Sequence, residues 1–101
     1  MYYIKAIRGE VHMGKIIQRA TAGTLESSDV LVTLEPACGL EIEIDSVVQN
    51  QFGAAIRQTV EEVLNDLQVQ DAKLSIVDRG ALDCVIRARV ETAVLRGKGE
   101  C

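Results

Sequence analysis

The hydrophobic period of the sequence changes sharply at Ser46, and this change restricts the fold more than any other feature. Before it, the segment Leu40-Glu-Ile-Glu-Ile-Asp45 alternates apolar and acidic residues, as a strand with one buried face requires. After it, apolar residues recur at every third or fourth position as far as Leu67, as an amphipathic helix requires. Ser46 and Gln49 also have the spacing of a capping box. The chain therefore places a half-exposed strand directly before a long helix.

The remaining patterns complete an alternation of strands and helices. In chain order they predict an extended segment over 15–25, a polar turn over 26–29, a strand over 29–35, a strand over 73–77 and a closing helix from about Leu82 to Gly97. The order β-β-β-α-β-α is typical of an α+β domain with a mostly antiparallel sheet and two helices packed on one face. In the closing helix we expect Leu82 to point inward. We also expect Gly97 to stop this helix and residues 98–101 to form a frayed tail.

Length and composition favour one small domain. The 101 residues suffice for a single core, and with 48% hydrophobic residues and only Phe52, Tyr2 and Tyr3 aromatic, that core must be aliphatic. No apolar run approaches the roughly 20 residues of a membrane span, and the start of the chain does not resemble a secretory signal. The sequence thus predicts a cytoplasmic protein with no membrane association. Residues 1–12 are expected to be an N-terminal extension or a cloning remnant, with Met13 as an alternative start.

Charge and cysteine content disfavour several classes of partner. The net charge of -4 repels phosphate backbones, so a nucleic-acid-binding protein is not expected. The cysteines, Cys38, Cys84 and Cys101, have no metal-ligand spacing, and the single histidine, His12, is far from them in the sequence. We therefore expect no disulfide framework and no metal site. Cys84, within the closing helix, is expected to be a small buried hydrophobic residue.

The polar turn offers the best-placed hydroxyl groups in the chain. Ser27 and Ser28 stand at the tip of the expected hairpin, where a side chain is exposed while the strands anchor the backbone. A modifying enzyme can reach such a hydroxyl, and a bulky charged substituent there stays out of the core. Glu26 and Asp29 would add negative charge that holds a phosphate group off the protein surface. Serine and acidic residues are also ordinary turn formers, so the pattern alone leaves both interpretations open.

Catalysis by this chain alone has no comparable support. A serine or cysteine nucleophile needs a neighbouring base, and His12 is distant in sequence from every candidate. The carboxylates of Glu41, Glu43 and Asp45 share one strand face. Three acids on an outer face are typical of a solvated surface more often than of a metal site, and Glu41 and Glu43 are also candidates for part of a docking surface.

Three segments resemble the citrate lyase acyl carrier protein family, the gamma subunits of that enzyme. They are Ala22-Gly-Thr-Leu-Glu-Ser-Ser-Asp-Val30, Gln51-Phe-Gly-Ala-Ala-Ile-Arg57 and Asp78-Arg-Gly-Ala-Leu-Asp-Cys-Val-Ile-Arg-Ala-Arg89. They follow the family's order at about its separations. Residues 1–12 lie outside the resemblance, which favours Met13 as the natural start and residues 13–101 as a single acyl-carrier domain.

The resemblance implies a covalent carrier role. Ser27 matches the family's attachment position for a phosphoribosyl-dephospho-coenzyme A group, joined through a phosphodiester, and Ser28 falls where relatives vary. The implied protein is a non-catalytic subunit that presents acetyl and citryl thioesters to an alpha subunit (an acyl transferase) and a beta subunit (a citryl lyase). A prosthetic-group transferase is a further implied partner. The complex would cleave citrate to oxaloacetate and acetate. The predicted order of strands and helices distinguishes this α+β carrier from the four-helix acyl carrier bundle.

Two alternatives remain open at this stage. The carrier subunit of malonate decarboxylase uses a similar group for another reaction, although the long matching segments favour citrate lyase. A stand-alone regulatory domain that binds a small ligand without a covalent bond would instead leave Ser27 unmodified. That domain would also need a ligand pocket between its sheet and its helices.

Overall fold

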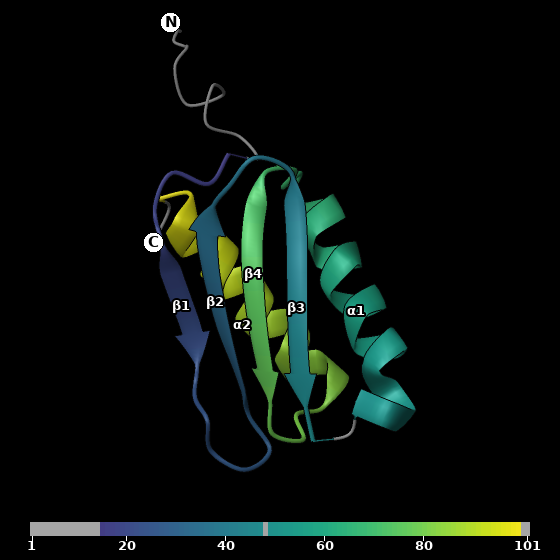
Figure 1. The fold of residues 1–101 in the computed structure, drawn as a ribbon. Helices are drawn as coiled ribbons and strands as arrows, with labels where there is room; N and C mark the ends of the chain where they lie inside the picture. The colour runs from purple at the N-terminus through teal and green to yellow at the C-terminus, as the bar shows by residue number, and fades with distance from the viewer. Residues whose placement is uncertain (1–14, 48, 100–101) are drawn as a thin grey trace, which may run out of the picture.

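The computed structural model describes residues 15–47 and 49–99, with the backbone alone for 49–52 (Figure 1). The expected N-terminal extension, residues 1–12, lies outside the described residues. The elements are β1 (Ala20–Gly23), β2 (Val30–Pro36), β3 (Leu40–Ser46), α1 (Gln49–Asp66), β4 (Ala72–Asp78) and α2 (Asp83–Gly97). The predicted order of elements is confirmed, although β1 is shorter than the extended segment expected over 15–25.

The four strands form one mixed sheet in the order β1-β2-β4-β3. β2 pairs antiparallel with both β1 and β4, whereas β3 pairs with β4 in parallel. The mostly antiparallel sheet is therefore confirmed, and the parallel pair joins strands separated by α1. Such a pair needs a long crossover connection, which the helix supplies. It follows that β1, β3 and β4 all run in the same direction, so that the loops after them lie at one end of the molecule (Figure 1).

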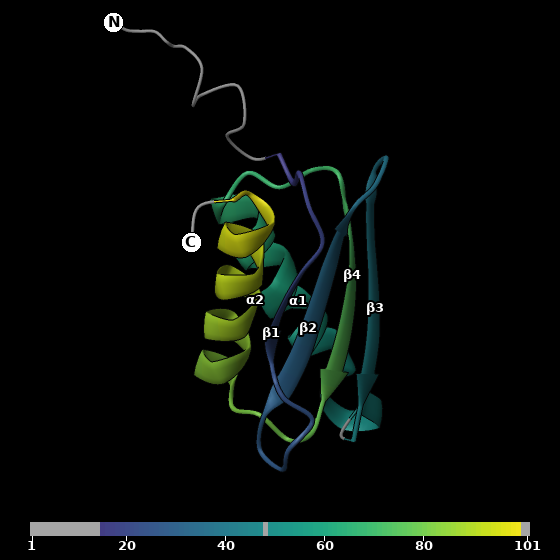
Figure 2. The ribbon, with the colours of Figure 1, turned by 90° about the vertical axis from the view of Figure 1, so that its left-hand side faces the viewer.

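Both helices cover the same face of the sheet, as predicted (Figure 2). α1 packs on α2 and β3, and α2 packs on β1 and β2. The strands bury alternate residues toward this layer: Val30, Val32 and Leu34 of β2 are fully buried, and the residues between them are half-exposed. A period of two thus separates the core face from the outer face.

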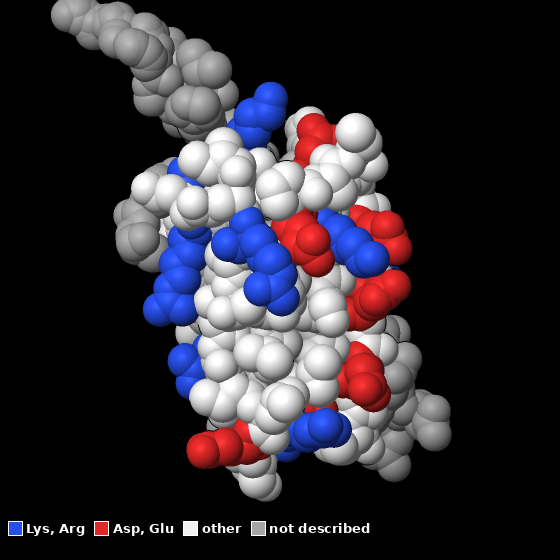
Figure 3. Space-filling model, turned by 60° about the vertical axis from the view of Figure 1, so that its left-hand side comes forward, with Lys and Arg blue, Asp and Glu red and all other residues white. Residues whose placement is uncertain are grey.

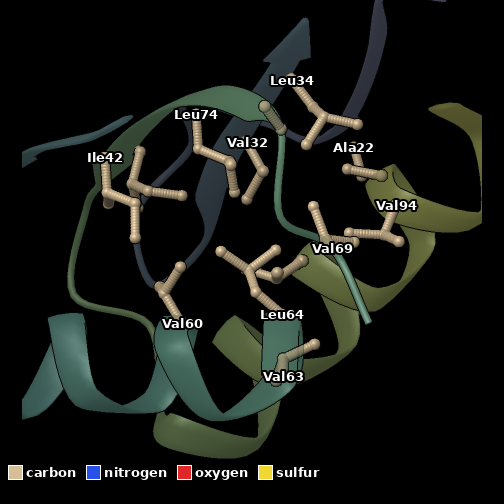
Figure 4. Close-up of a cluster of buried hydrophobic side chains, with 14 of the residues drawn as sticks. Ala22, Val32, Leu34, Ile42, Val60, Val63, Leu64, Val69, Leu74 and Val94 are labelled. Atoms are coloured by element: carbon tan, nitrogen blue, oxygen red, sulfur yellow. The ribbon is translucent and has the colours of Figure 1, made fainter. Parts of the chain in front are cut away.

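An aliphatic core fills the space between the sheet and the helices (Figure 4). Its helical side chains are Ile56, Val60, Val63 and Leu64 of α1 and Ile86, Val90, Ala93 and Val94 of α2. Among the described residues, the buried hydrophobic side chains are all Ile, Val, Leu or Ala, as the composition requires. These positions recur at helical spacing, as the sequence pattern predicted for them.

The start of the closing helix differs from expectation. Leu82 precedes α2 and is 72% exposed, and Cys84 is exposed instead of buried. The inner stripe of α2 begins at Ile86 and continues at Val90, so that Cys84 lies off this stripe by about half a turn. The expectations that Leu82 points inward and that Cys84 is a core residue are wrong.

Lys98, the first residue of the expected frayed tail, is packed against the fold, whereas residues 100–101 lie outside the described residues. Gly97 is the last residue of the helix and lies against the buried Leu34; a Cβ atom on Gly97 would be 2.4 Å from Leu34 Cδ2. The side chain of Lys98 donates a hydrogen bond to the Leu67 carbonyl at 2.8 Å, and Lys98 is only 9% exposed. Close packing with β2 therefore explains this glycine, and Lys98 joins the two helices.

Candidate modification site

The loop between β1 and β2 contains a tight turn with Ser27 at its outer corner. The Asp29 N–H donates to the Glu26 carbonyl at 3.1 Å, so Ser27 and Ser28 are the two central residues. Ser28 has a φ of 67°, whereas Ser27 has no positive φ. A positive φ at only the second central residue is the geometry of a type II turn. The hairpin predicted from the polar turn is therefore confirmed.

The Ser27 side chain is exposed at this corner. Within the part of the chain that the structure describes, its hydroxyl takes part in no hydrogen bond with another residue. Ser28 is exposed too, but its N–H donates to the Arg79 carbonyl at 2.8 Å and its backbone is in the left-handed region. The structure thus places an accessible hydroxyl on Ser27 and fixes the backbone at the residue after it.

The carboxylate of Asp29 anchors this turn. Its carboxylate accepts hydrogen bonds from the Thr24 hydroxyl at 2.7 Å, the Val30 N–H at 2.7 Å, and the guanidinium of Arg89 on α2 at 3.1 and 3.2 Å. These donors, the Thr24 hydroxyl foremost, lower the pKa of Asp29 to about 2. The Asp29 side chain is only 14% exposed. The expectation that Asp29 adds free surface charge beside Ser27 is therefore wrong.

Thr24 and Gly23 set the backbone geometry just before the turn. The Thr24 hydroxyl accepts a hydrogen bond from the Glu26 N–H at 3.1 Å while it donates to Asp29. Gly23 has a φ of 92°, and a Cβ atom there would stand 1.8 Å from the carbonyl oxygen of Val30. No other residue type allows the two strands to approach so closely at this point.

A second loop joins the first through Arg79, the residue after β4. Its carbonyl accepts from the Ser28 N–H, and its own N–H donates to the Asp29 carbonyl at 2.9 Å. Two residues of the hairpin thus oppose one residue of the other chain segment, which is a β-bulge. Bulges of this kind bend a strand and redirect its side chains, here at the turn that carries Ser27.

A third loop is attached through Asp78, a carboxylate that is only 1% exposed. It accepts hydrogen bonds from the Ser46 hydroxyl at 2.7 Å and the Ala81 N–H at 2.9 Å, and its carbonyl accepts from the Val47 N–H at 3.3 Å. Ser46 is the last residue of β3, and the side chain of its expected capping partner, Gln49, lies outside the described residues. The loops after β1, β3 and β4 are therefore connected to one another.

The other sequence candidates lie away from this turn. Glu41, Glu43 and Asp45 are exposed along the edge strand β3, as expected. Among residues 15–47 and 49–99, no three carboxylate, cysteine or histidine groups lie together as a metal site. Asp83, at the start of α2, accepts hydrogen bonds from Thr59 and Arg87, which lower its pKa and connect the two helices.

Comparison with known proteins identifies the family of the chain. Residues 17–97 match the family model described as malonate decarboxylase delta subunit. A citrate lyase acyl carrier protein of Vibrio cholerae serotype O1 is 57% identical over 84 residues, which cover 81% of this chain and 86% of the relative. The chain belongs to the citrate lyase acyl carrier protein family. A further member, from Treponema denticola, is 52% identical over 82 residues, which cover 81% of this chain and 94% of that relative.

A solved structure confirms the fold of this carrier family member. A chain in the crystal structure of a Pseudomonas malonate decarboxylase hetero-tetramer in complex with malonate superposes with a TM-score of 0.67. The two sequences are 30% identical, and the match covers 81% of this chain and 90% of the other. The carrier is therefore more similar in sequence to the citrate lyase proteins, at 52–57% identity, than to this malonate decarboxylase chain. No helix among the described residues has the length and apolar character of a membrane span.

Proposed function

We propose that this protein is the acyl carrier subunit of a citrate lyase and that Ser27 holds a phosphoribosyl-dephospho-coenzyme A group through a phosphodiester. The observation that carries the proposal is the exposed Ser27 hydroxyl, which has no partner among the described residues and stands on an anchored turn. Membership of the carrier family supports the same role.

The surroundings of Ser27 suit a phosphate-bearing substituent. The corner of a type II turn leaves room for a large group, since the Ser27 side chain projects into solvent. Asp29 is paired with Arg89, and its charge is therefore compensated. Arg79 lies across the bulge and adds a positive charge near the turn. When attached, the group supplies a thiol at the end of a long arm.

The chain itself contributes position. Asp29, Arg89 and Arg79 fix the turn, so the attachment point stays in place while the arm moves. Tethering of this kind raises the local concentration of the carried acyl group to the millimolar range or above. The catalytic groups for citrate cleavage belong, in this proposal, to the alpha and beta subunits of a cytoplasmic complex.

Intact-mass measurement on carrier purified from cells that make the whole complex tests the attachment. Wild-type chain should show the added mass of the coenzyme A derivative, and Ser27→Ala should show none. Ser28→Gly is the matched control, because glycine tolerates the φ of 67° that Ser28 adopts, and it should be modified as fully as wild type. An unmodified wild-type chain in an active complex would contradict the proposal.

The second candidate function is the carrier subunit of a malonate decarboxylase. The matching family model and the superposition at a TM-score of 0.67 favour it. Reconstitution separates the two functions: modified carrier is added to carrier-free alpha and beta subunits of citrate lyase, or to carrier-free malonate decarboxylase. We expect restored citrate cleavage and no comparable restoration of malonate decarboxylation, and the reverse result would identify the second function.

A further inference from the structure

We propose that the end of the molecule that carries Ser27 is the docking surface for the transferase that attaches the prosthetic group. This surface, the serine end, consists of residues 24–29, 47 and 79–82, the loops that follow β1, β3 and β4. The inference rests on the proposed function. It adds the contact surface for one partner, and the acidic residues of β3 are not part of it.

Exposed apolar side chains gather at the serine end. Five large hydrophobic residues are exposed within the described chain: Leu82 at 72%, Val47 at 62%, Leu25 at 53%, Ile17 at 49% and Leu40 at 45%. The three most exposed follow β4, β3 and β1, which run in the same direction, and therefore all lie at the serine end. Ile17 precedes β1 and Leu40 begins β3, so both lie at the opposite end. Exposed apolar groups gathered at one end of a molecule are typical of a protein interface.

The serine end is also held rigid before any partner binds. Arg79 is hydrogen-bonded to the backbone of Ser28 and Asp29, and Asp78 receives hydrogen bonds from Ser46 and Ala81. The loops that carry the exposed apolar residues are thus fixed relative to the Ser27 turn. A pre-ordered surface loses little conformational entropy on binding, which favours its use in recognition.

The serine end carries an exposed positive charge that suits a partner with a phosphate-bearing substrate. Arg79 is exposed, and among the described residues its side chain forms no ion pair, whereas Arg87 and Arg89 each pair with carboxylates. Figure 3 shows basic and acidic side chains at the lower end, where the β1–β2 loop lies, beneath a broad uncharged area. Arg79 is the residue whose backbone is hydrogen-bonded to Ser28 and Asp29, and its guanidinium has no ion-pair partner among the described residues. Such a group is complementary to the phosphate-rich donor that the transferase must bind, because guanidinium groups bind phosphate with two hydrogen bonds.

A hollow beside Leu82 continues the apolar surface. Its volume is about 340 Å³, and it is lined by Ala55, Ile56, Asp78, Ala81, Leu82, Asp83 and Ile86. Most of these side chains are apolar, so a hydrophobic side chain of the partner can enter it without leaving a polar group unpaired.

The chemistry at Ser27 explains why the partner is the transferase. The Ser27 oxygen attacks a phosphorus atom of an activated donor, a phosphoanhydride of the prosthetic group. A new P–O bond forms, the anhydride P–O bond breaks with release of a polyphosphate leaving group, and a base of the transferase takes the hydroxyl proton. The active site of that enzyme must therefore come within bonding distance of Ser27 and contact the residues around it. Enzymes that act on the thiol at the far end of the arm form no bond with the Ser27 oxygen.

Calorimetric titration of unmodified carrier with the transferase tests the docking surface. We expect the double variant Leu25→Gln with Leu82→Gln to bind at least 10-fold more weakly than wild type, and Arg79→Gln to bind several-fold more weakly. The matched controls are Ile17→Gln and Leu40→Gln, which remove exposed apolar side chains from the opposite end and should bind within about twofold of wild type. Thermal unfolding checks that each variant is folded. If the double variant does not fold, Leu25→Gln and Leu82→Gln are titrated separately instead.

The outcomes separate docking from the carrier role. Ser27→Ala should bind like wild type and remain unmodified in the intact-mass assay. If the serine-end variants bind as tightly as wild type while wild type is modified at Ser27, the docking surface is wrong and the carrier role stands. If the transferase leaves the wild-type chain unmodified, the carrier proposal itself is contradicted. Equal losses in the control variants would also overturn the docking surface, because binding would then not depend on the serine end.

Discussion

At the scale of single residues, Asp29 is the group on which the candidate site depends. Its carboxylate joins three parts of the molecule: Thr24 at the loop entry, Val30 at the start of β2 and Arg89 on α2. Each partner favours the ionised carboxylate, and the pKa of Asp29 is accordingly lowered to about 2. A group whose pKa is lower in the folded chain than in the unfolded chain stabilises the fold only while it is ionised.

The pH dependence of stability follows from the direction of the Asp29 pKa shift. The unfolded-state pKa of an aspartate is about 3.9, so the contribution of Asp29 is complete above about pH 4 and is lost as the pH falls toward 2. We expect wild type to have a higher Tm than Asp29→Asn at pH 7, with a difference that shrinks between pH 4 and pH 2. Calorimetry at a series of pH values measures it. A difference that is constant over this range would show that the Asp29 charge contributes nothing.

At the scale of elements, the β1–β2 hairpin depends on the close approach of Gly23 to Val30. A Cβ atom 1.8 Å from a carbonyl oxygen cannot be accommodated unless the strands separate. Separation would move the turn that carries Ser27 and would displace Asp29 from Arg89. The geometry of the hairpin thus connects a backbone position in β1 to the candidate site.

Two glycines with similar backbone angles form a matched test. Gly39 has a φ of 86° with open space around it, whereas Gly23 has a φ of 92° with Val30 in contact. Gly39→Ala should therefore lose only the left-handed strain of about 1–2 kcal/mol. Gly23→Ala should lose about 3 kcal/mol or more, because strain and a steric clash combine. Chemical denaturation of both variants gives the comparison, and equal losses would mean that the contact with Val30 is easily relieved.

At the scale of the whole molecule, the position of β4 between β2 and β3 organises the domain. The central strands contain fully buried side chains such as Val32 of β2 and Leu74 and Ile76 of β4. β1 is short and lies at the edge of the sheet, next to the loop that carries Ser27. Stability should therefore decrease from the centre of the sheet toward the candidate site.

Hydrogen exchange measures this gradient. We expect the amides of Val32, Leu74 and Ile76 to exchange most slowly, near the rate set by global unfolding, because their strands are hydrogen-bonded on both sides. Amides of residues 24–28 should exchange earlier, because this loop is exposed to solvent next to the short edge strand β1. Residue-resolved exchange by NMR is the measurement. Equal protection of the loop and the central strands would show that the domain opens only as one unit.

For the candidate site, local sequence reasoning identified the exposed hydroxyl but not the residues that hold it. A polar turn between two strands predicted the exposure of Ser27, because turn preferences are properties of a few neighbouring residues. The pairing of Asp29 with Arg89 had no local signal, since these residues are remote in the sequence and meet only when α2 packs on the sheet. We expected Cys84 in the core because a free cysteine behaves as a small hydrophobic residue. Its position on α2 instead places it on the exposed side of the helix.

The order of strands and helices, the aliphatic core and the turn at Ser27 could be predicted from the sequence, because hydrophobic period and turn preference act over a few residues. The position of β4 between β2 and β3, and its parallel pairing with β3, became visible only in the folded chain. Strand order depends on how the crossover through α1 packs, and this is an interaction between distant segments. The same packing brings the loops after β1, β3 and β4 to one end of the molecule, which also carries the exposed side chains of Leu25, Val47 and Leu82.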